Sequence, residues 1–309
     1  FSVALVALPL GLGIAAAAEA PIMSGVLSAI LGGLLTTLLR HSKIAVNGPG
    51  NAMIVMIATA LSTLGDFRLV LAAIACSGAL MLLMGIFRFG TLAEALPHGV
   101  IQGLLTAIGI IIMVKQIYIT LGTQPRSDHI IEMIKELPLA FSRTNPFVAM
   151  ISFISLLILI LHPRIKNKFI HFMPAPLWVI MCSIPMVQGF NFLNGHTITL
   201  FNHSYHVGHE FLMQLPTDMN QSIMFPDFSA IGSPAFWGIV MTLTLVNTIE
   251  TLVSITAIDK LDPFRRKTNT NQDLMAVGAT TVLGGSIGAL PISTVIMRSS
   301  VNVNHGAKT

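Results

Sequence analysis

An acid and a base lie where the sequence is otherwise apolar. Glu250 interrupts the run 246–254, and Arg298 lies in the last hydrophobic stretch of the chain. A charge at membrane depth costs about 2.5–3.5 kcal/mol on insertion scales, so charged residues there usually have a function. A buried carboxylate can bind a proton, or, with Ser254 one turn later and backbone carbonyls of broken helices, it can help to hold Na⁺. The competing interpretation is a structural acid hydrogen-bonded to Ser or Thr neighbours.

Two short stretches place an extended segment and a proline directly before an apolar helix. The first covers 43–52 and contains Gly48-Pro49-Gly50, and the second covers 288–294 and contains Pro291. Proline fits the first helical turn, because its missing N–H would be unpaired there anyway. Paired, proline-interrupted short spans are the best sequence indication of a binding site at the middle of a membrane. We therefore expect two facing half-helices.

Facing helix starts suit an anion, because they offer free backbone N–H groups and positive dipole ends. Gly48 and Gly50 lack a Cβ and let a ligand approach the backbone closely. Arg298, about one turn into the second short helix, either completes the positive site or extends to the membrane surface. Neutral side chains near the two breaks add further donors: Asn47, Asn51, Ser293 and Thr294.

The composition indicates an all-α polytopic membrane protein. Of 309 residues, 53% are hydrophobic and 10% are charged, whereas about a quarter of a soluble domain is charged. The net charge of +4 indicates an asymmetry between loops rather than a nucleic-acid-binding surface. Cys76 and Cys182 form neither a disulfide framework nor a metal-ligand spacing. We expect no cleavable signal peptide before the first apolar run.

About ten membrane spans are predicted from runs of mainly apolar residues, some of them short enough to belong to broken helices. The predicted ranges are 3–17, 21–39, 48–64, 69–87, 99–118, 145–161, 174–189, 235–256, 272–288 and 293–305.

The distribution of Lys and Arg predicts a cytoplasmic N-terminus. The loop 190–234 then lies outside and contains no Lys or Arg, whereas the outside segment 119–144 contains three and is an exception. The predicted cytoplasmic loops contain ten cations, namely Arg40, Lys43, Arg88, Arg164, Lys166, Lys168, Lys260, Arg265, Arg266 and Lys267.

Two outside segments carry weaker signals. Over 130–137, apolar residues recur at a helical spacing and charged residues lie between them. This pattern predicts a short amphipathic connector helix at the membrane interface. His203, His206 and His209 are three apart and would share a face as metal ligands if they were helical. The preceding run 197–201 favours an extended segment, so we interpret these histidines and His196 as solvated loop residues and expect no metal site.

The positions of the two breaks indicate an internal repeat. If residues 1–234 hold seven spans, Gly48-Pro49 lies in the third span, and Pro291 lies in the third span of a second set. We therefore predict a first repeat over 1–234, with the loop 190–234 at its end, and the start of a second repeat over 235–309.

Several motifs, in this order, resemble the sulfate permease (SulP) family of inorganic anion transporters, which is related to the animal SLC26 exchangers. The resemblance covers essentially the whole chain. It is carried by Leu8-Pro9-Leu10-Gly11-Leu12, Val46-Asn47-Gly48-Pro49, Asn271-Gln272-Asp273-Leu274, Pro291 and Arg298-Ser299-Ser300-Val301-Asn302-Val303-Asn304. The last motif distinguishes the chain from nucleobase permeases, which share the fold.

The resemblance implies fourteen spans in two inverted seven-span repeats, with a core domain that moves against a gate domain. Four gate spans and any cytoplasmic STAS domain would follow the tenth span. The family's anion site, between the third and tenth half-helices, corresponds to Gly48, Pro49, Gly50, Asn51, Ser293 and Thr294. Glu250 matches the eighth-span acid, Ser254 the position of a hydroxyl that helps to bind Na⁺ in bicarbonate-transporting members, and Arg298 the tenth-span arginine.

These features predict a multi-pass transporter of the bacterial inner membrane rather than an enzyme, since no nucleophile–base pair lies in the spans. Its substrate would be a small inorganic anion, sulfate or bicarbonate, moved by secondary active transport coupled to H⁺ or Na⁺ through Glu250. The alternatives are an uncoupled exchanger or channel, or a dicarboxylate transporter. No cofactor is expected beyond the coupling ion. The partners are the lipid bilayer and, as an open option, a second copy of the full-length protein.

Overall fold

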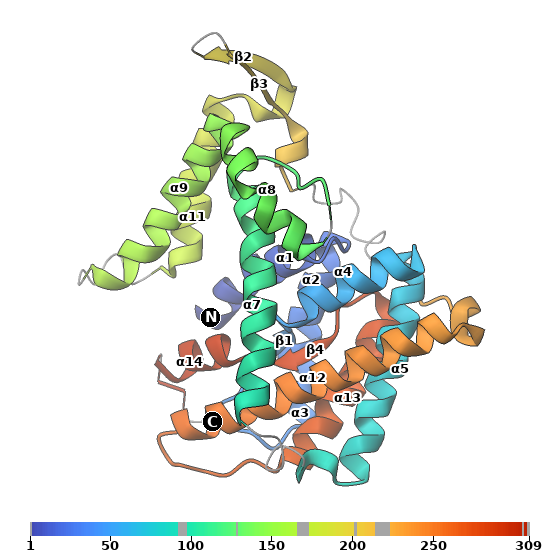
Figure 1. The fold of residues 1–309 in the computed structure, drawn as a ribbon. Coiled ribbons are helices and arrows are strands. Elements are labelled where there is room, and N and C mark those ends of the chain that lie inside the picture. Colours follow the sequence, from blue (N-terminus) through green and yellow to red (C-terminus); the bar gives the residue numbers. More distant parts are fainter. Residues whose placement is uncertain are drawn as a thin grey trace. The chain divides into compact units, whose positions relative to one another are not determined.

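The structure is a computed structural model of the chain (Figure 1). It describes residues 2–91, 98–127, 129–165, 173–200, 203–213, 223–304 and 306–307, so Lys166 and Lys168 of the predicted loops lie outside the described residues. The described chain is mainly α-helical and has two small antiparallel sheets. It forms two compact units, one of residues 1–108 and 215–309 and one of residues 109–214. This division by packing does not test the predicted repeat boundary at residue 234, which stays a prediction.

The first unit contains both predicted breaks. Its strands are β1 (Asn47–Pro49) and β4 (Ile292–Thr294). A π-helix covers Gly32–Thr36, and 3₁₀ turns cover Phe89–Thr91 and Ser229–Gly232. Its helices are α1 (Ser2–Ala17), α2 (Ile22–Leu31), α3 (Thr37–Leu39), α4 (Met53–Leu64), α5 (Phe67–Ile86), α12 (Pro234–Leu261), α13 (Thr270–Ile287) and α14 (Ile296–Asn304).

Small residues let α5 and α13 pack closely, and the two helices lie side by side in Figure 1. A Cβ on Gly78 would lie 2.7 Å from the backbone nitrogen of Val282, and one on Gly278 would lie 2.5 Å from that of Leu82. Glycine at these contacts allows the backbones to approach, as is common between membrane helices. Side chains also define where these helices begin: Asp66 accepts from the N–H of Arg68 at 2.8 Å, and Asn269 caps α13.

The predicted span 21–39 is helical but not uniform. Between α2 and α3 the backbone widens into the π-helix, a rare feature that is frequent at functional sites. A Cβ on Gly32 would lie 2.8 Å from the carbonyl carbon of Asn47. The widened turn therefore brings the α2 backbone directly against β1.

The second unit consists of helices and one hairpin. Its helices are α8 (Ile130–Ser142), α9 (Pro146–Leu161) and α11 (Ala175–Gly189), and α7 (His98–Leu121) begins in the first unit and ends here. Its strands are β2 (His196–Leu200) and β3 (His203–Val207), and its 3₁₀ turns cover His162–Arg164, Phe192–Asn194 and His209–Phe211.

Two segments that were predicted to lie outside can now be compared with the secondary structure expected for them. The amphipathic helix is confirmed as α8, whose Met133 and Ala140 pack against Val114 and Tyr118 of α7. The hydroxyl of Tyr118 donates to the carbonyl of Met133 at 2.7 Å. The extended interpretation of the run 197–201 is also confirmed for its described residues, which lie on β2, and His203 and His206 lie on β3. A shared helical face for those histidines is wrong.

Each of the ten predicted ranges contains a helix or half-helix among the described residues. Four helical segments there are long and apolar enough to cross a membrane by length and composition, namely Ile22–Leu39, Phe67–Ile86, Pro146–Arg164 and Pro234–Leu261. Other apolar helices, including α1, α4 and α11, are shorter. The total of ten spans therefore stays a prediction.

Candidate functional site

The two predicted breaks meet in the first unit. β1 and β4 pair in antiparallel fashion, with Asn47 opposite Thr294 and Gly48 opposite Ser293, and all four residues are buried. Each strand is followed within a few residues by a helix, α4 after β1 and α14 after β4. The free N–H groups of both helix starts therefore lie close to one strand pair.

Arg298 lies inside the protein, against Gly48. Its side chain is fully buried, and a Cβ on Gly48 would overlap its Nη1 atom. Within the described parts of the chain, none of the three guanidinium nitrogens has a hydrogen-bond partner. Burying a charged group without a partner is costly, so this guanidinium is suited to bind an anion. The alternative, in which Arg298 reaches the membrane surface, is wrong; the neighbouring Met297 is the exposed residue, at 60%.

Neutral donors surround the same strand pair. The side-chain amide of Asn47 and the hydroxyls of Ser293 and Thr294 are buried, and they too make no hydrogen bond to any described residue. Pro49 is buried in β1, whereas Asn51 is exposed at the start of the first short helix. All of these predicted donors except the exposed Asn51 therefore lie at the β1–β4 strand pair.

Glu250 of α12 meets the first break at Gly50. Its Oε1 atom accepts from the N–H of Ala52 at 3.3 Å. A Cβ on Gly50 would contact Glu250 Oε2 and would lie 2.5 Å from Ser293 Oγ. Although Glu250 is only partly buried as a residue, its Oε2 atom is inaccessible and makes no hydrogen bond to the described residues. The carboxylate of Glu250, the hydroxyl of Ser293 and the backbone of Gly50 thus lie close together.

Ser254 is less closely connected to this cluster. It follows Glu250 by one turn of α12 and is 4% exposed. No hydrogen bond to Glu250 is recorded among the described residues. The structure therefore places Ser254 on the buried side of α12, and its proposed contact with Na⁺ stays a prediction.

Buried polar side chains hold the second break in place, and the sequence analysis did not identify them. The hydroxyl of Ser28 donates to the carbonyl of Leu290 at 2.9 Å. The amide of Asn247 donates to the carbonyl of Ile292 at 3.1 Å, and the hydroxyl of Thr281 contacts both the N–H and the carbonyl of Ile292 at 3.3 Å. Their only signal in the sequence is a polar residue inside an apolar span.

One face of α14 holds the chain that leads into β1. Ser299 Oγ accepts from the N–H of Val46 at 2.9 Å, and Asn302 Nδ2 donates to the carbonyl of Ile44 at 3.2 Å. The N–H of Val295 donates to the carbonyl of Val46 at 3.1 Å. The second half-helix therefore fixes the position of the first strand directly.

Asp273 anchors the same segment further back along the chain. It is 1% exposed, and its Oδ1 atom accepts from the N–H groups of His41 and Ser42 at 2.6 and 3.1 Å. Asp273 belongs to the motif 271–274, so a structural role explains part of that motif.

The whole chain, residues 1–309, matches the model of the sulfate permease family. The chain belongs to this family. Its members are transporters rather than enzymes, and the apolar helices described above are those of a multi-pass membrane protein.

Curated relatives match over nearly the whole chain at low identity. "Putative sulfate transporter YvdB" of Bacillus subtilis (strain 168) is 22% identical over 99% of this chain and 54% of its own length. "Bicarbonate transporter BicA" of Synechocystis sp. (strain PCC 6803) is 22% identical over 99% of this chain and 52% of its own length. The chain thus spans about half the length of the curated relatives it matches.

Solved structures show the same fold. The transmembrane domain of a cyanobacterial bicarbonate transporter BicA superposes with a TM-score of 0.77 at 22% identity, covering 99% of this chain and 76% of the other. The structure of SLC26A9 superposes with a TM-score of 0.76 at 19% identity, covering 100% of this chain and 50% of the other. The described helices therefore form part of this transporter fold.

Proposed function

We propose that the protein is a secondary active transporter of a small inorganic anion, with sulfate or bicarbonate as substrate and H⁺ or Na⁺ as the coupling ion. The observation that carries the proposal is the fully buried guanidinium of Arg298, which lies against Gly48 and has no acceptor among the described residues. The curated relatives named sulfate and bicarbonate transporters support this substrate class.

The anion would bind at the β1–β4 pair. Arg298 supplies the positive charge, and Asn47, Ser293 and Thr294 supply neutral donors. Gly48 and Gly50 let the ligand approach the backbone. The N–H groups at the starts of the two short helices favour negative charge at the same place.

Glu250 would link this anion to a cation. Two like charges roughly 8 Å apart repel each other by about 2 kcal/mol at an effective dielectric constant of about 20. An ionised Glu250 therefore weakens anion binding, and neutralising it with H⁺ or Na⁺ restores that binding. The two ions then bind cooperatively, which is the thermodynamic requirement for symport.

The wider topology belongs to the same proposal. We infer ten spans in this chain, seven in a first repeat over 1–234 and three in a second repeat over 235–309, with the N-terminus on the cytoplasmic side of the inner membrane. Homodimerisation of the full-length protein fits the proposal but is not required by it.

Uptake by the reconstituted full-length protein tests the coupling role. Labelled sulfate or bicarbonate should accumulate under an inward H⁺ or Na⁺ gradient. In Glu250→Gln, gradient-driven accumulation should disappear while exchange of anion for anion persists, because the neutral amide imitates the cation-bound acid. The matched control is Glu132→Gln, an exposed acid on α8 that should transport like the wild type.

Other outcomes would separate the competing hypotheses. Unchanged gradient-driven uptake in Glu250→Gln would exclude Glu250 as the coupling group, whereas anion transport or current that persists without a cation gradient in the wild type would favour an uncoupled exchanger or channel. Loss of both accumulation and exchange would favour a structural acid, a role consistent with the hydrogen bond that Glu250 accepts from Ala52 at the start of α4. A panel that includes succinate tests the dicarboxylate alternative.

A further inference from the structure

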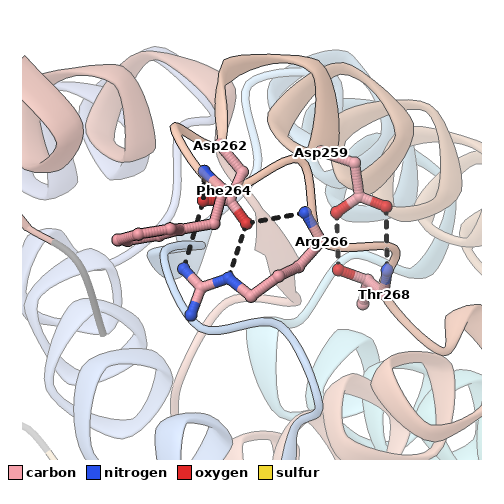
Figure 2. A network of polar contacts seen from close by, with 5 residues as sticks. All are labelled: Asp259, Asp262, Phe264, Arg266 and Thr268. Atoms are coloured by element: carbon pink, nitrogen blue, oxygen red, sulfur yellow. Dashed lines mark hydrogen bonds and ion pairs between the residues drawn. The ribbon is translucent and has the colours of Figure 1, made fainter.

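The loop between α12 and α13 has a defined shape because two aspartates organise it (Figure 2). Asp262 accepts from Arg266 Nε at 2.7 Å and from Nη2 at 3.1 Å, and it also accepts from the N–H of Phe264 at 3.1 Å. Asp259 accepts from the N–H and the hydroxyl of Thr268 at 2.9 and 2.6 Å. The hydrogen bonds from Arg266 lower the pKa of Asp262 to about 2, so this carboxylate stays ionised and engaged near neutral pH.

The carboxylates of this loop accept hydrogen bonds from groups of the loop itself, whereas three of its cations do not pair with these carboxylates. Lys260, Arg265 and Lys267 are exposed, and none forms an ion pair with a described residue. Arg266 differs from them, because it is held by Asp262. The loop therefore presents a net positive surface on a well-ordered backbone.

These cations line a hollow rather than a flat surface. A cavity of about 660 Å³ is bordered by all three of them, together with Thr256 of α12 and Thr91 beyond α5. A neighbouring cavity of about 330 Å³ shares part of this wall and has Lys43 on its border. Sites of several hundred cubic ångströms are large enough for a small polar group.

Apolar side chains lie directly beside the cations. Phe264 is 58% exposed and Leu261 is 43% exposed. Leu261 is the last residue of α12, a 28-residue helix long and apolar enough to cross the membrane, and Phe264 follows three residues later in the loop. Exposed apolar and aromatic residues next to Lys and Arg at a span end are typical of a segment at the membrane interface. The guanidinium carbon of Arg266 lies 5.1 Å from the centre of the Phe264 ring. Because the ring is still 58% exposed, it offers an apolar surface that a lipid can use and a free inorganic anion cannot.

We propose that this loop binds the headgroup of an anionic phospholipid. Lys260, Arg265 and Lys267 contact the phosphate oxygens, and Phe264 and Leu261 lie at the boundary of the acyl chains. The proposal does not depend on which anion is transported.

Native mass spectrometry of the full-length protein, in a neutral detergent with added phosphatidylglycerol and phosphatidylcholine, measures the retained lipid directly. The wild type should retain phosphatidylglycerol preferentially. The variant Lys260→Gln/Arg265→Gln/Lys267→Gln should lose about five-fold in affinity for each cation removed. Equal retention by this variant and the wild type would overturn the proposal.

A matched triple variant controls for total charge. Arg126→Gln/Lys135→Gln/Arg143→Gln removes three exposed cations from the segment 119–144 and should retain phosphatidylglycerol like the wild type. If the loop triple variant does not fold, Lys260→Gln alone should still show about a five-fold loss. Phe264→Ser should also weaken retention of the lipid. Displacement of phosphatidylglycerol by an equal concentration of inorganic phosphate would contradict the lipid assignment, because it would identify a site for free anions.

Discussion

The proposed anion site depends most directly on the size of the side chain at Gly48. A side chain there would meet the end of the Arg298 side chain, which can move, rather than backbone, which cannot. At Gly32 the opposite holds, because a Cβ would meet the backbone of Asn47 and Gly48 at 2.8 Å. One glycine therefore determines where the guanidinium lies, and the other determines whether the elements pack at all.

We predict that Gly48→Ala inserts and folds but transports with an apparent anion affinity lower by roughly five- to 150-fold, since overpacking a site typically costs about 1–3 kcal/mol. Transport KM in vesicles, together with the thermal unfolding midpoint, separates affinity from stability. Gly238→Ala on α12 is the control, because a Cβ there meets nothing within 4 Å. An unchanged KM in Gly48→Ala would exclude the Gly48–Arg298 contact from recognition.

At the scale of elements, the second half-helix, α14, has two roles in the proposed site. It carries Arg298, and it also hydrogen-bonds the chain that enters β1 through Val295, Ser299 and Asn302. Ser299 and Asn302 are three residues apart and so share one face of α14, and Val295 directly precedes the helix. The position of the anion site therefore depends on residues that do not contact the anion.

Adjacent serines on α14 test this positioning role. Ser299 is fully buried and accepts from the N–H of Val46, whereas the hydroxyl of Ser300 donates only within its own helix, to Met297 at 2.8 Å. Leaving the Val46 N–H unpaired costs about 1–3 kcal/mol, so Ser299→Ala should raise the KM for the anion. Ser300→Ala should leave KM unchanged. If Ser299→Ala only reduces the yield of folded protein, with a normal KM in the molecules that fold, its role is structural.

The sequence predicts the elements of this site better than the contacts between them. Gly48-Pro49-Gly50 and Pro291 mark both breaks because proline and glycine restrict or free the backbone locally. The π-helix at Gly32–Thr36 is not marked in this way, since it depends on distant contacts such as the hydrogen bond of 3.0 Å between Thr36 and Thr280. The sequence also does not determine where the Arg298 side chain points, for a related reason. From the sequence alone, either Arg298 or its neighbour Met297 could be the buried residue, because the surrounding helices determine which side of α14 is covered.

At the scale of the whole molecule, the proposed site belongs to one compact unit. All ten predicted site residues lie within residues 1–108 and 215–309. Hydrogen bonds from α12 and α13 hold Ile292 of β4, and hydrogen bonds from α2 and α14 hold the residues that lead into the two strands, Leu290 and Val46. A site built in this way is suited to move as one body, so access to it would change without the anion site being taken apart. The same bracing would keep Glu250 at a fixed distance from an anion bound at the proposed site.

That fixed distance predicts a dependence on the charge of the substrate. An ionised Glu250 repels a divalent anion twice as strongly as a monovalent one, so an effect of about 2 kcal/mol on nitrate becomes about 4 kcal/mol on sulfate. In Na⁺-free buffer at alkaline pH, which favours the ionised acid, Glu250→Gln should therefore lower the KM for sulfate by roughly thirty-fold more than the KM for nitrate. Counterflow measurements without an ion gradient isolate this binding effect. Equal changes for the two anions would show that Glu250 acts through shape or hydrogen bonding, and the cation would then have to couple to transport through a different group.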